Sequence, residues 1–451
     1  MDNKRDRAVL AVLFAVFLLI NGILVIIHEP WRDEIHAWLM SRYMTIPEMI
    51  SFSRYEAHPL LWHFMLIPLA KLGAPIWTMN LLSYLITGAS AFIFVFKTKL
   101  NTIVKAAVLF TIPFIYTYSS VARNYTLILL FGMIIAAMYG KRHEHPFLFS
   151  IPIALMVFTH AMAWGFVAGV TITFHIFELA RVILKKNTLE RKTVISMLSG
   201  LVLIAASTVF VVVTLYGSDT PGLYVAPNDE TDKIVLAMII LMGAVIGYAV
   251  YRRGTVWKEA FTFFASLSFM IVIYRTVYSG VIFQRLILIQ VFLLIFVICV
   301  HDTNKIPNIA AAAVYFLSFL ITGALFDTFY YVSEDIRSNY SSAQEMAAYI
   351  NTNLPSEKVI LVDAGIFAQT MVPYTDKELY DIRYQANIED SLYCVNEPEK
   401  IMDAIFDIPN HEEYRGKYLI LYYAMEGAPF DVVYRTSDSV TGENYTLYYI
   451  P

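Results

Sequence analysis

Charged residues are scarce in this chain of 451 residues. Asp, Glu, Lys and Arg make up 16% of it, whereas soluble domains carry about 25%. Hydrophobic residues reach 58%, and the mean hydropathy is +0.58. This balance excludes an ordinary soluble domain and predicts an integral membrane protein. The net charge of −4 gives no indication of a nucleic-acid partner.

Cysteines and repeated sequence are scarce as well. The two cysteines are Cys299, in an apolar run, and Cys394, far away in a polar region. They exclude the disulfide framework of small secreted domains, and we interpret both as unpaired. The sequence contains no internal repeat and no low-complexity tract, which counts against a transporter built from two related halves.

Long apolar runs, by contrast, are abundant. A helix needs roughly 20 apolar residues to cross about 30 Å of hydrocarbon. The first run, residues 8–27, follows Lys4, Arg5 and Arg7. It is too long for a signal peptide and no small-residue cleavage site follows, so we interpret it as an uncleaved first span. The preceding basic residues place the N-terminus in the cytoplasm.

Ten further runs bring the prediction to about 11 transmembrane helices. Cytoplasmic loops are rich in Lys and Arg, and the basic residues fall in alternate gaps, such as Lys141 with Arg142 and Arg252 with Arg253. A multi-pass topology in the plasma membrane is therefore self-consistent, with the C-terminus outside. The runs cover residues 77–96, 103–119, 124–140, 146–159, 162–180, 194–215, 233–251, 259–275, 282–300 and 307–327.

One apolar segment does not fit this count. Residues 58–73 are short and contain Pro68, and a span here would put the later basic clusters outside. We interpret the segment as a juxtamembrane or re-entrant helix. The first external loop then covers about residues 28–75, with two short amphipathic helices, from about Asp33 to Met44 and from Pro59 to Leu72.

The composition changes after about Asp327. We predict a transmembrane module over residues 1–327 and a small extracytoplasmic α/β domain over residues 328–451. A helix is indicated in this domain by four apolar residues that share one face, and strands by KVILVDAG, by KYLILYYA and by the hairpin pattern DVVYRTSDSVTGENYTLYYI. The four helical residues are Ala343, Met346, Ala347 and Ile350.

The stretch WRDEIHAWLMSR, residues 31–42, places charge directly after the first span. Asp33 and Glu34 would stand at the outer membrane surface, where a carboxylate reaches both a lipid headgroup and water. Arg32 and His36 add a phosphate-binding group and a second titratable group. Solvated loop acids are the alternative interpretation of this stretch.

A second cluster, RYEAHPLLWHF, begins at Arg54 and precedes the returning apolar helix. Pro59 suits the first turn of a helix, so an ordinary polar lead-in is the simplest interpretation. That interpretation leaves Glu56 and His58 together unexplained, and we treat both as candidate substrate-binding residues.

Further candidates lie at predicted external turns. Arg123 and Tyr125 belong to YSSVARNY, and His160 belongs to FTHAMAW. An arginine on the outer side needs an anionic partner, which could equally be a structural carboxylate, and a histidine at a span end is more often structural. Arg275 and Arg285 bracket a later turn and offer a fork for a lipid-linked phosphate, because guanidinium binds phosphate with planar, bidentate hydrogen bonds.

These features occur in a familiar order along the chain. The motifs RDEIHAWLMSR, EAHPLLWHFML, ARNY and QRLIL resemble those of the GT-C glycosyltransferases, in particular the branch of protein O-mannosyltransferases and the lipid A aminoarabinose transferase. The resemblance covers about residues 1–327. It departs from the family at Leu60, where a second proline is usual, and at Leu286, where Tyr usually follows the arginine.

The resemblance implies roles for particular residues. Asp33 would be the catalytic base with Glu34 beside it, and Arg285 would bind the phosphate of a polyprenyl-phosphate sugar, helped by Arg275 or Arg123. The reaction would invert the anomeric centre by direct displacement. The resemblance requires no cofactor, although the two adjacent acids permit a divalent metal, Mg²⁺ or Mn²⁺.

The sequence therefore predicts a glycosyltransferase of the cell envelope. It would move a sugar from a polyprenyl-phosphate donor in the bilayer to a protein, lipid or glycan acceptor on the extracytoplasmic face. The alternatives are a transporter or flippase of lipid-linked glycans, and a polymerase or ligase of surface polysaccharide. A transporter would place ionisable residues near span midpoints, whereas here they gather at outer ends.

Overall fold

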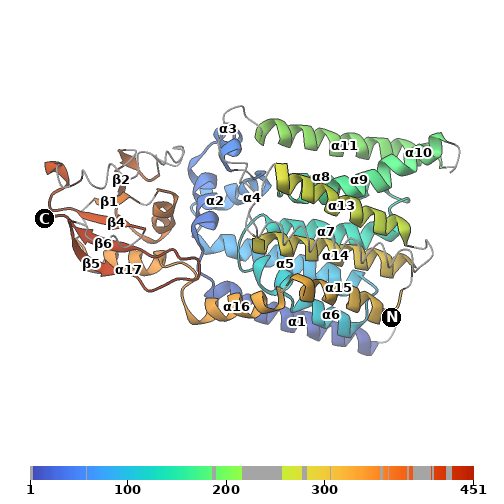
Figure 1. Ribbon diagram of the computed structural model, residues 1–451, viewed down its shortest axis with the longest axis horizontal. Helices are drawn as coiled ribbons and strands as arrows, with labels where there is room; N and C mark the ends of the chain where they lie inside the picture. The colour runs from blue at the N-terminus through green and yellow to red at the C-terminus, as the bar shows by residue number, and fades with distance from the viewer. Residues whose placement is uncertain are drawn as a thin grey trace. The chain divides into compact units, whose positions relative to one another are not determined.

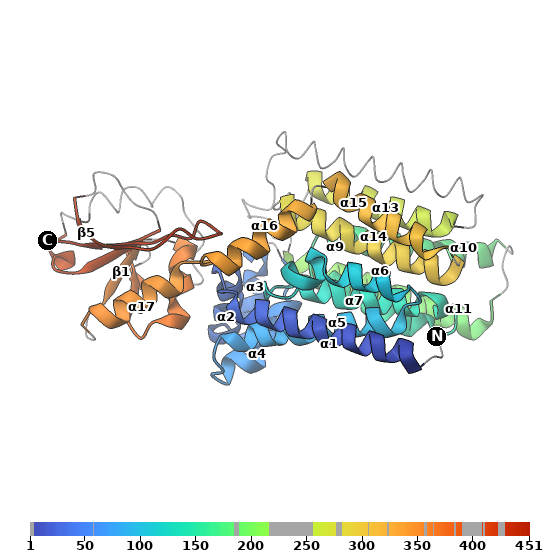
Figure 2. The same cartoon turned by 90° about the horizontal axis from the view of Figure 1, so that it is seen from below.

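The computed structural model (Figures 1 and 2) describes residues 4–56, 58–184, 189–215, 256–276, 282–304, 306–322, 324–355, 359–363, 365–382, 385–389, 408, 411–422 and 429–451. The chain folds into two compact units. The helical unit comprises Met1–Ile23, Ile50–Trp62 and Leu81–Phe329, and the sheet unit comprises Leu24–Met49, His63–Asn80 and Tyr330–Pro451. The boundary at 327/328 and its assignment to two sides of a membrane stay predictions.

Apolar helices make up the helical unit (Figure 1). Every predicted span overlaps a helix except residues 233–251, which lie outside the described residues. The apolar helices indicate a membrane-embedded protein, while the total of about 11 spans stays a prediction. Within the described residues, four stretches are long and apolar enough to cross a membrane: Lys4–Ile27, Trp77–Lys97, Ala163–Ile183 and Arg191–Leu215.

Several of the predicted spans are interrupted. One is divided into α6 (Thr102–Leu109) and the π-helix η1 (Pro113–Thr117), and another contains a π-helical segment, η3 (Ile172–Ile176), between two α-helices. The remaining helices are α1 (Lys4–Ile27), α5 (Trp77–Lys97), α7 (Tyr125–Met138), η2 (Tyr139–Lys141), α8 (Pro146–Val157), α9 (Ala163–Thr171), α10 (Phe177–Ile183), α11 (Arg191–Leu215), α13 (Trp257–Thr276), α14 (Ile282–Asn304), α15 (Asn308–Thr322) and α16 (Ala324–Arg337).

Polar side chains from α1 and α5 support η1 and the non-helical turn between η1 and α7. Ser83 Oγ donates a hydrogen bond to the Ser119 carbonyl at 2.8 Å, Thr87 donates to the Tyr118 carbonyl, and Asn21 Nδ2 donates to the Ile115 carbonyl at 3.0 Å. An unsatisfied backbone group in hydrocarbon costs several kcal/mol. These bonds therefore let the chain leave helical geometry here, where the predicted site residues of α7 begin.

Two glycines bring α9 and α13 close together. A Cβ atom added at Gly169 would lie 2.7 Å from the Thr262 carbonyl oxygen and 2.8 Å from the Ser266 nitrogen, and one added at Gly165 would lie 2.7 Å from the Met270 nitrogen. Because these neighbours are backbone atoms, no side-chain rotation relieves the clash. The pair forms the small-xxx-small pattern typical of packed membrane helices.

The described residues of the sheet unit form a six-stranded mixed sheet of order β3-β2-β1-β4-β6-β5. The central strand β1 pairs in parallel with β2 and β4, and the remaining pairs are antiparallel. Its residues Ile360, Leu361 and Val362 are all buried, which confirms the prediction of a buried strand at KVILVDAG. The strands are β1 (Ile360–Asp363), β2 (Leu379–Asp381), β3 (Ala386–Asn387), β4 (Tyr418–Leu421), β5 (Asp431–Arg435) and β6 (Thr446–Tyr449).

Helix α17 (Ala343–Asn353) covers one face of this sheet together with the 3-10 helix η4 (Gly365–Tyr374). The predicted apolar face of α17 is confirmed, since Ala343, Met346, Ala347 and Ile350 are all fully buried. The predicted hairpin is confirmed as the antiparallel pair β5 and β6. Strands β2 and β3 were not predicted, because three and two residues are too short to show a pattern.

The first loop contains three helices, α2 (Arg32–Tyr43), α3 (Ile46–Glu56) and α4 (Leu61–Lys71). The prediction that α2 is amphipathic is wrong, because every residue from Glu34 to Ser41 is buried. Helix α3 was missed, although Thr45 and Glu48 form a capping box, which is a recognisable sequence signal. Helix α4, with 11 residues, is about 16 Å long, too short to span a bilayer.

The contact between α9 and α13 makes a prediction for Gly169→Val. Overpacking at such a site costs about 1–3 kcal/mol, so the apparent melting temperature of the purified protein should fall by several degrees. Gly140→Ala is the control, since a Cβ atom there meets no atom within 4 Å. Equal melting temperatures for the two variants would contradict the close packing.

Candidate functional site

Asp33 and Glu34 are neighbours in the first turn of α2, but their side chains lie in opposite surroundings. Glu34 is fully buried and accepts hydrogen bonds from the Trp31 amide at 3.3 Å and from His28 Nε2 at 3.1 Å. The Asp33 side chain is 26% exposed, with its Oδ1 3.3 Å from Arg32 Nε. Adjacent helical residues point in different directions, and here one carboxylate is buried while the other is partly exposed.

His28 lies between two buried carboxylates. Its Nδ1 is 2.9 Å from Asp335 of α16 and its Nε2 is 3.1 Å from Glu34, so the imidazolium form donates to both. Burial by itself lowers the pKa of His28, but the two carboxylates outweigh that effect and raise it to about 10. The Tyr340 ring lies against the imidazole, with 4.5 Å between ring centroids.

Two further carboxylates are buried close to the start of α2. Burial raises the pKa of Glu29 to about 8, although its carboxylate accepts the Gln344 amide hydrogen at 2.9 Å. Burial also raises the pKa of Glu443 to about 7, opposed by hydrogen bonds from Ser341 and the Arg32 amide and by the charge of Arg32. The sheet unit therefore gathers acids from the first loop and from the C-terminal segment around Arg32 and Asp33.

Arg32 is the cation of this group. Its guanidinium carbon lies 4.6 Å from the Phe367 ring and 5.4 Å from the Trp31 ring, and one third of its side chain is exposed. Stacking on aromatic rings fixes the plane of a guanidinium while leaving its edge available. The contact of Arg32 with a phosphate stays a prediction.

His36 is buried one turn further along α2. Its Nδ1 lies 2.6 Å from Oε1 of Gln369, so it connects α2 to η4. This contact assigns His36 a part in fixing the helix, and its predicted contact with substrate stays a prediction.

The helical unit brings together four other predicted residues. The rings of His58 and His160 have centroids 4.8 Å apart, and His160 lies 5.3 Å from Tyr125. The Arg123 guanidinium carbon lies 5.9 Å from the Tyr125 ring. Asn124 donates to the Thr159 carbonyl at 2.6 Å and so joins the two turns that carry these side chains. Residues far apart in sequence therefore form one histidine and aromatic cluster.

Three other predicted residues lie in helices, but their side chains are outside the described residues. They are Glu56 in α3, Arg275 in α13 and Arg285 in α14. Their proposed contacts with donor or acceptor stay predictions.

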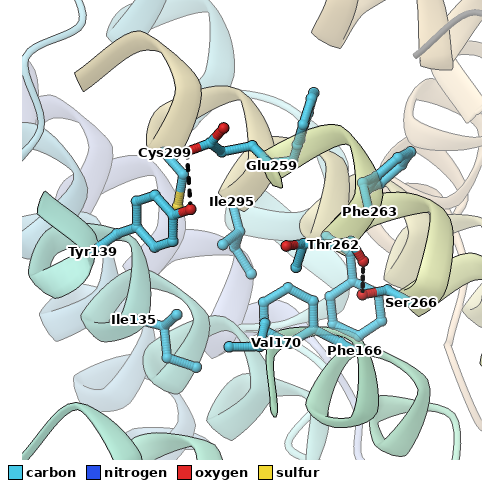
Figure 3. Close-up of a pocket in the computed structure, with 12 residues that line it drawn as sticks. Ile135, Tyr139, Phe166, Val170, Glu259, Thr262, Phe263, Ser266, Ile295 and Cys299 are labelled. Carbon is cyan, nitrogen blue, oxygen red and sulfur yellow. Dashed lines mark hydrogen bonds between the residues drawn. The ribbon is translucent and has the colours of Figure 1, made fainter. Parts of the chain in front are cut away.

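An apolar pocket with about 380 Å³ of empty space lies at the other end of α7 (Figure 3). Two hydrogen bonds join residues that line it: Tyr139 donates to Glu259 at 3.0 Å, and Ser266 Oγ donates to the Thr262 carbonyl at 2.7 Å. Tyr125 is the first residue of α7 and Tyr139 directly follows its last residue. The two residues therefore lie about 20 Å apart along the helix axis. None of the predicted site residues lines this pocket, so it is not the predicted centre. Its lining includes Ile135, Phe166, Val170, Thr262, Phe263, Ser266, Ile295 and Cys299.

Asp33 and Glu34 have separate partners in the structure, and a metal ion held by both stays a prediction. The Glu34 carboxylate is occupied by His28 and the Trp31 amide, while Asp33 faces Arg32. Across the described ranges, no group of three or more His, Cys, Asp or Glu side chains is arranged to hold a metal ion.

Sequence reasoning missed the acids that surround the first turn of α2. His28 and Glu29 come directly before the recognised motif, so their position at the end of the first span was an available signal. Asp335 and Glu443 gave no such signal, because one lies in a polar helix end and the other in a hairpin turn, where acids are usually solvated.

The His28 cluster predicts an effect of pH. A pKa raised from 6.5 to about 10 means that the folded protein binds this proton more tightly than the unfolded chain. The resulting stabilisation is complete below pH 6.5 and is lost as the pH rises through about 10. His28→Gln leaves two buried carboxylates uncompensated and should destabilise by about 3–5 kcal/mol at pH 7. Thermal unfolding of both proteins from pH 6 to 10 checks this, and curves that stay parallel would contradict it.

Comparison with known proteins finds one structural likeness. No protein-family model matches the chain, and no curated protein matches it. The chain is similar to ArnT from Cupriavidus metallidurans, crystallised bound to undecaprenyl phosphate, with 11% identity over 97% of each chain. The TM-score is 0.41, which by itself does not establish a common fold.

Proposed function

We propose that this protein is an integral-membrane glycosyltransferase of the GT-C type. It moves a sugar from a polyprenyl-phosphate donor to a hydroxyl-bearing protein, lipid or glycan on the extracytoplasmic face, with inversion at the anomeric carbon. The first-loop motif supports the reaction class, and the surroundings of Asp33 support the roles given to Asp33 and Glu34.

The observation that carries the proposal is the contrast between Asp33 and Glu34. A general base must be reachable by the proton it accepts. Asp33 is partly exposed beside Arg32, whereas Glu34 is buried against His28. The base is therefore Asp33, and Glu34 holds the turn that presents it.

Asp33 acts on the acceptor hydroxyl. Its carboxylate accepts the hydroxyl proton as the acceptor oxygen forms a bond to the anomeric carbon of the donor. The bond from that carbon to the phosphate oxygen breaks on the opposite side, and the electron pair leaves with the phosphate. Protonated Asp33 then returns the proton to water, which restores the carboxylate.

The departing phosphate needs a positively charged partner. Arg285 is proposed for this role, with Arg275 or Arg123 as helpers, because a guanidinium neutralises phosphate charge through paired hydrogen bonds. A preorganised donor in a dry site contributes about 3–4 kcal/mol to the transition state. These steps are written without a metal ion, and the Mg²⁺ or Mn²⁺ that the two adjacent acids permit stays a prediction.

The histidine and aromatic cluster of the helical unit suits a sugar. Tyr125 stacks on Tyr118 with an angle of 10° between the rings, and His160 lies against Tyr125. Tyr118, Tyr125 and His160 are buried, so the cluster would form the wall of a donor site and not an open stacking face. We assign His58, Arg123, Tyr125 and His160 to donor binding on this basis.

Sugar transfer by the purified enzyme in lipid tests the proposal. A panel of radiolabelled polyprenyl-phosphate sugars is offered with membrane extract as acceptor. Asp33→Asn should lower kcat about 10²–10⁴-fold through loss of the base, and Arg285→Ala should lower it about 10²–10³-fold through loss of phosphate stabilisation.

Matched controls come from the same region of the chain. Glu48→Gln removes an exposed first-loop carboxylate, and Arg42→Ala removes an exposed arginine of α2. Both should transfer sugar at the wild-type rate. Wild-type transfer by Asp33→Asn would refute the assignment of the base. Lipid binding with no transfer of any donor, together with lipid movement across the bilayer, would favour the transporter instead.

A further inference from the structure

In the sheet unit, the N-termini of α2 and α17 are each capped by a glutamate from the other segment of the chain. The Arg32 amide, at the first residue of α2, donates to both carboxylate oxygens of Glu443, at 3.2 and 3.4 Å. The Gln344 amide, in the first turn of α17, donates to Glu29 at 2.9 Å. The first loop therefore caps the C-terminal segment's helix, and the C-terminal segment caps the first loop's helix.

Such caps act through two physical effects. The first amide groups of a helix have no partner within it, and the helix dipole favours negative charge at that end. Glu443 and Glu29 are both buried, with the Glu443 side chain 1% exposed, so water does not replace them easily. Removal of either side chain would therefore leave a buried backbone amide without its acceptor, which is costly.

Glu443 also contacts the side chain that adjoins Asp33. Its Oε1 lies 3.9 Å from Arg32 Nε, and the same nitrogen lies 3.3 Å from Asp33 Oδ1. Arg32 thus stands between the two carboxylates. The main chain of residue 443 is fixed in turn, because its carbonyl accepts the Ser342 amide hydrogen at 3.1 Å.

We propose that Glu443 is a positioning residue for Asp33. It fixes the first turn of α2 through the Arg32 amide and fixes the Arg32 guanidinium beside the base, so the C-terminal segment orients the catalytic carboxylate without touching substrate. This assignment rests on the proposed function, since it takes Asp33 to be the base. It also gives the segment after α16 a role in the proposed reaction.

Hydrogen–deuterium exchange of the full-length protein in lipid tests the structural part without any substrate. Glu443→Ala should speed exchange of the amides of residues 31–34 about fivefold, the size expected when a helix cap is lost. Glu443→Gln keeps an oxygen that accepts the Arg32 hydrogen bond and should restore most of the protection. Glu345→Ala is the matched control, because Glu345 accepts hydrogen bonds from Tyr434 and Ser437 within the C-terminal segment.

Kinetics test the positioning role. Glu443→Ala should lower kcat about 10- to 100-fold, as displaced catalytic groups do, and leave KM for the donor within about twofold, because its side chain does not bind the donor. Glu443→Gln should recover much of this loss, and Glu345→Ala should leave kcat unchanged.

The outcomes test the positioning role of Glu443 separately from the proposed glycosyltransferase function. Unchanged exchange in Glu443→Ala, or faster exchange with wild-type kcat, would overturn the positioning role. An equal loss of kcat in Glu345→Ala would also overturn it, by pointing to general destabilisation. Faster exchange in a protein whose wild type transfers no sugar would support the cap and refute the proposed function instead.

Discussion

The ion cluster of His28, Glu34 and Asp335 is the constraint on which the candidate site depends. Three ionisable groups are buried together, and removal of any one would leave an uncompensated charge. The cluster fixes the chain directly after α1, the first turn of α2 and the end of α16 in one arrangement. Because Glu34 is held in this way, its neighbour Asp33 is presented outward. One acid of the motif supports the structure, and the other is the proposed base.

The helical unit meets a different constraint. Backbone groups that leave helical geometry inside an apolar unit must still find partners. Asn21, Ser83 and Thr87 supply these partners for the turn that carries Arg123 and leads into Tyr125. The close approach of α9 and α13 at two glycines stabilises the same unit by packing. Small and polar residues within the apolar helices therefore specify the architecture of the helical unit.

Local patterns in the sequence predicted much of the fold. Apolar runs located the helices of the helical unit and the strands β1 and β4. A shared helical face located α17, and the alternation of apolar residues located the β5–β6 hairpin. The same reasoning failed for α2, which was expected to be amphipathic and is buried over most of its length. Its polar residues suggested a solvated face, whereas Glu34 and His36 find partners contributed by other segments.

The sequence by itself determined the class of protein, the helical runs and the motif that contains Asp33, since these depend on composition and on neighbours along the chain. Only the tertiary structure decided which of two adjacent acids is exposed, and which distant residues surround them. Asp335 and Glu443 lie about 300 and 410 positions from α2, as their separations from His28 and Arg32 show. No local pattern encodes such contacts, because the free energy that holds a buried carboxylate comes from partners brought together only when the chain folds.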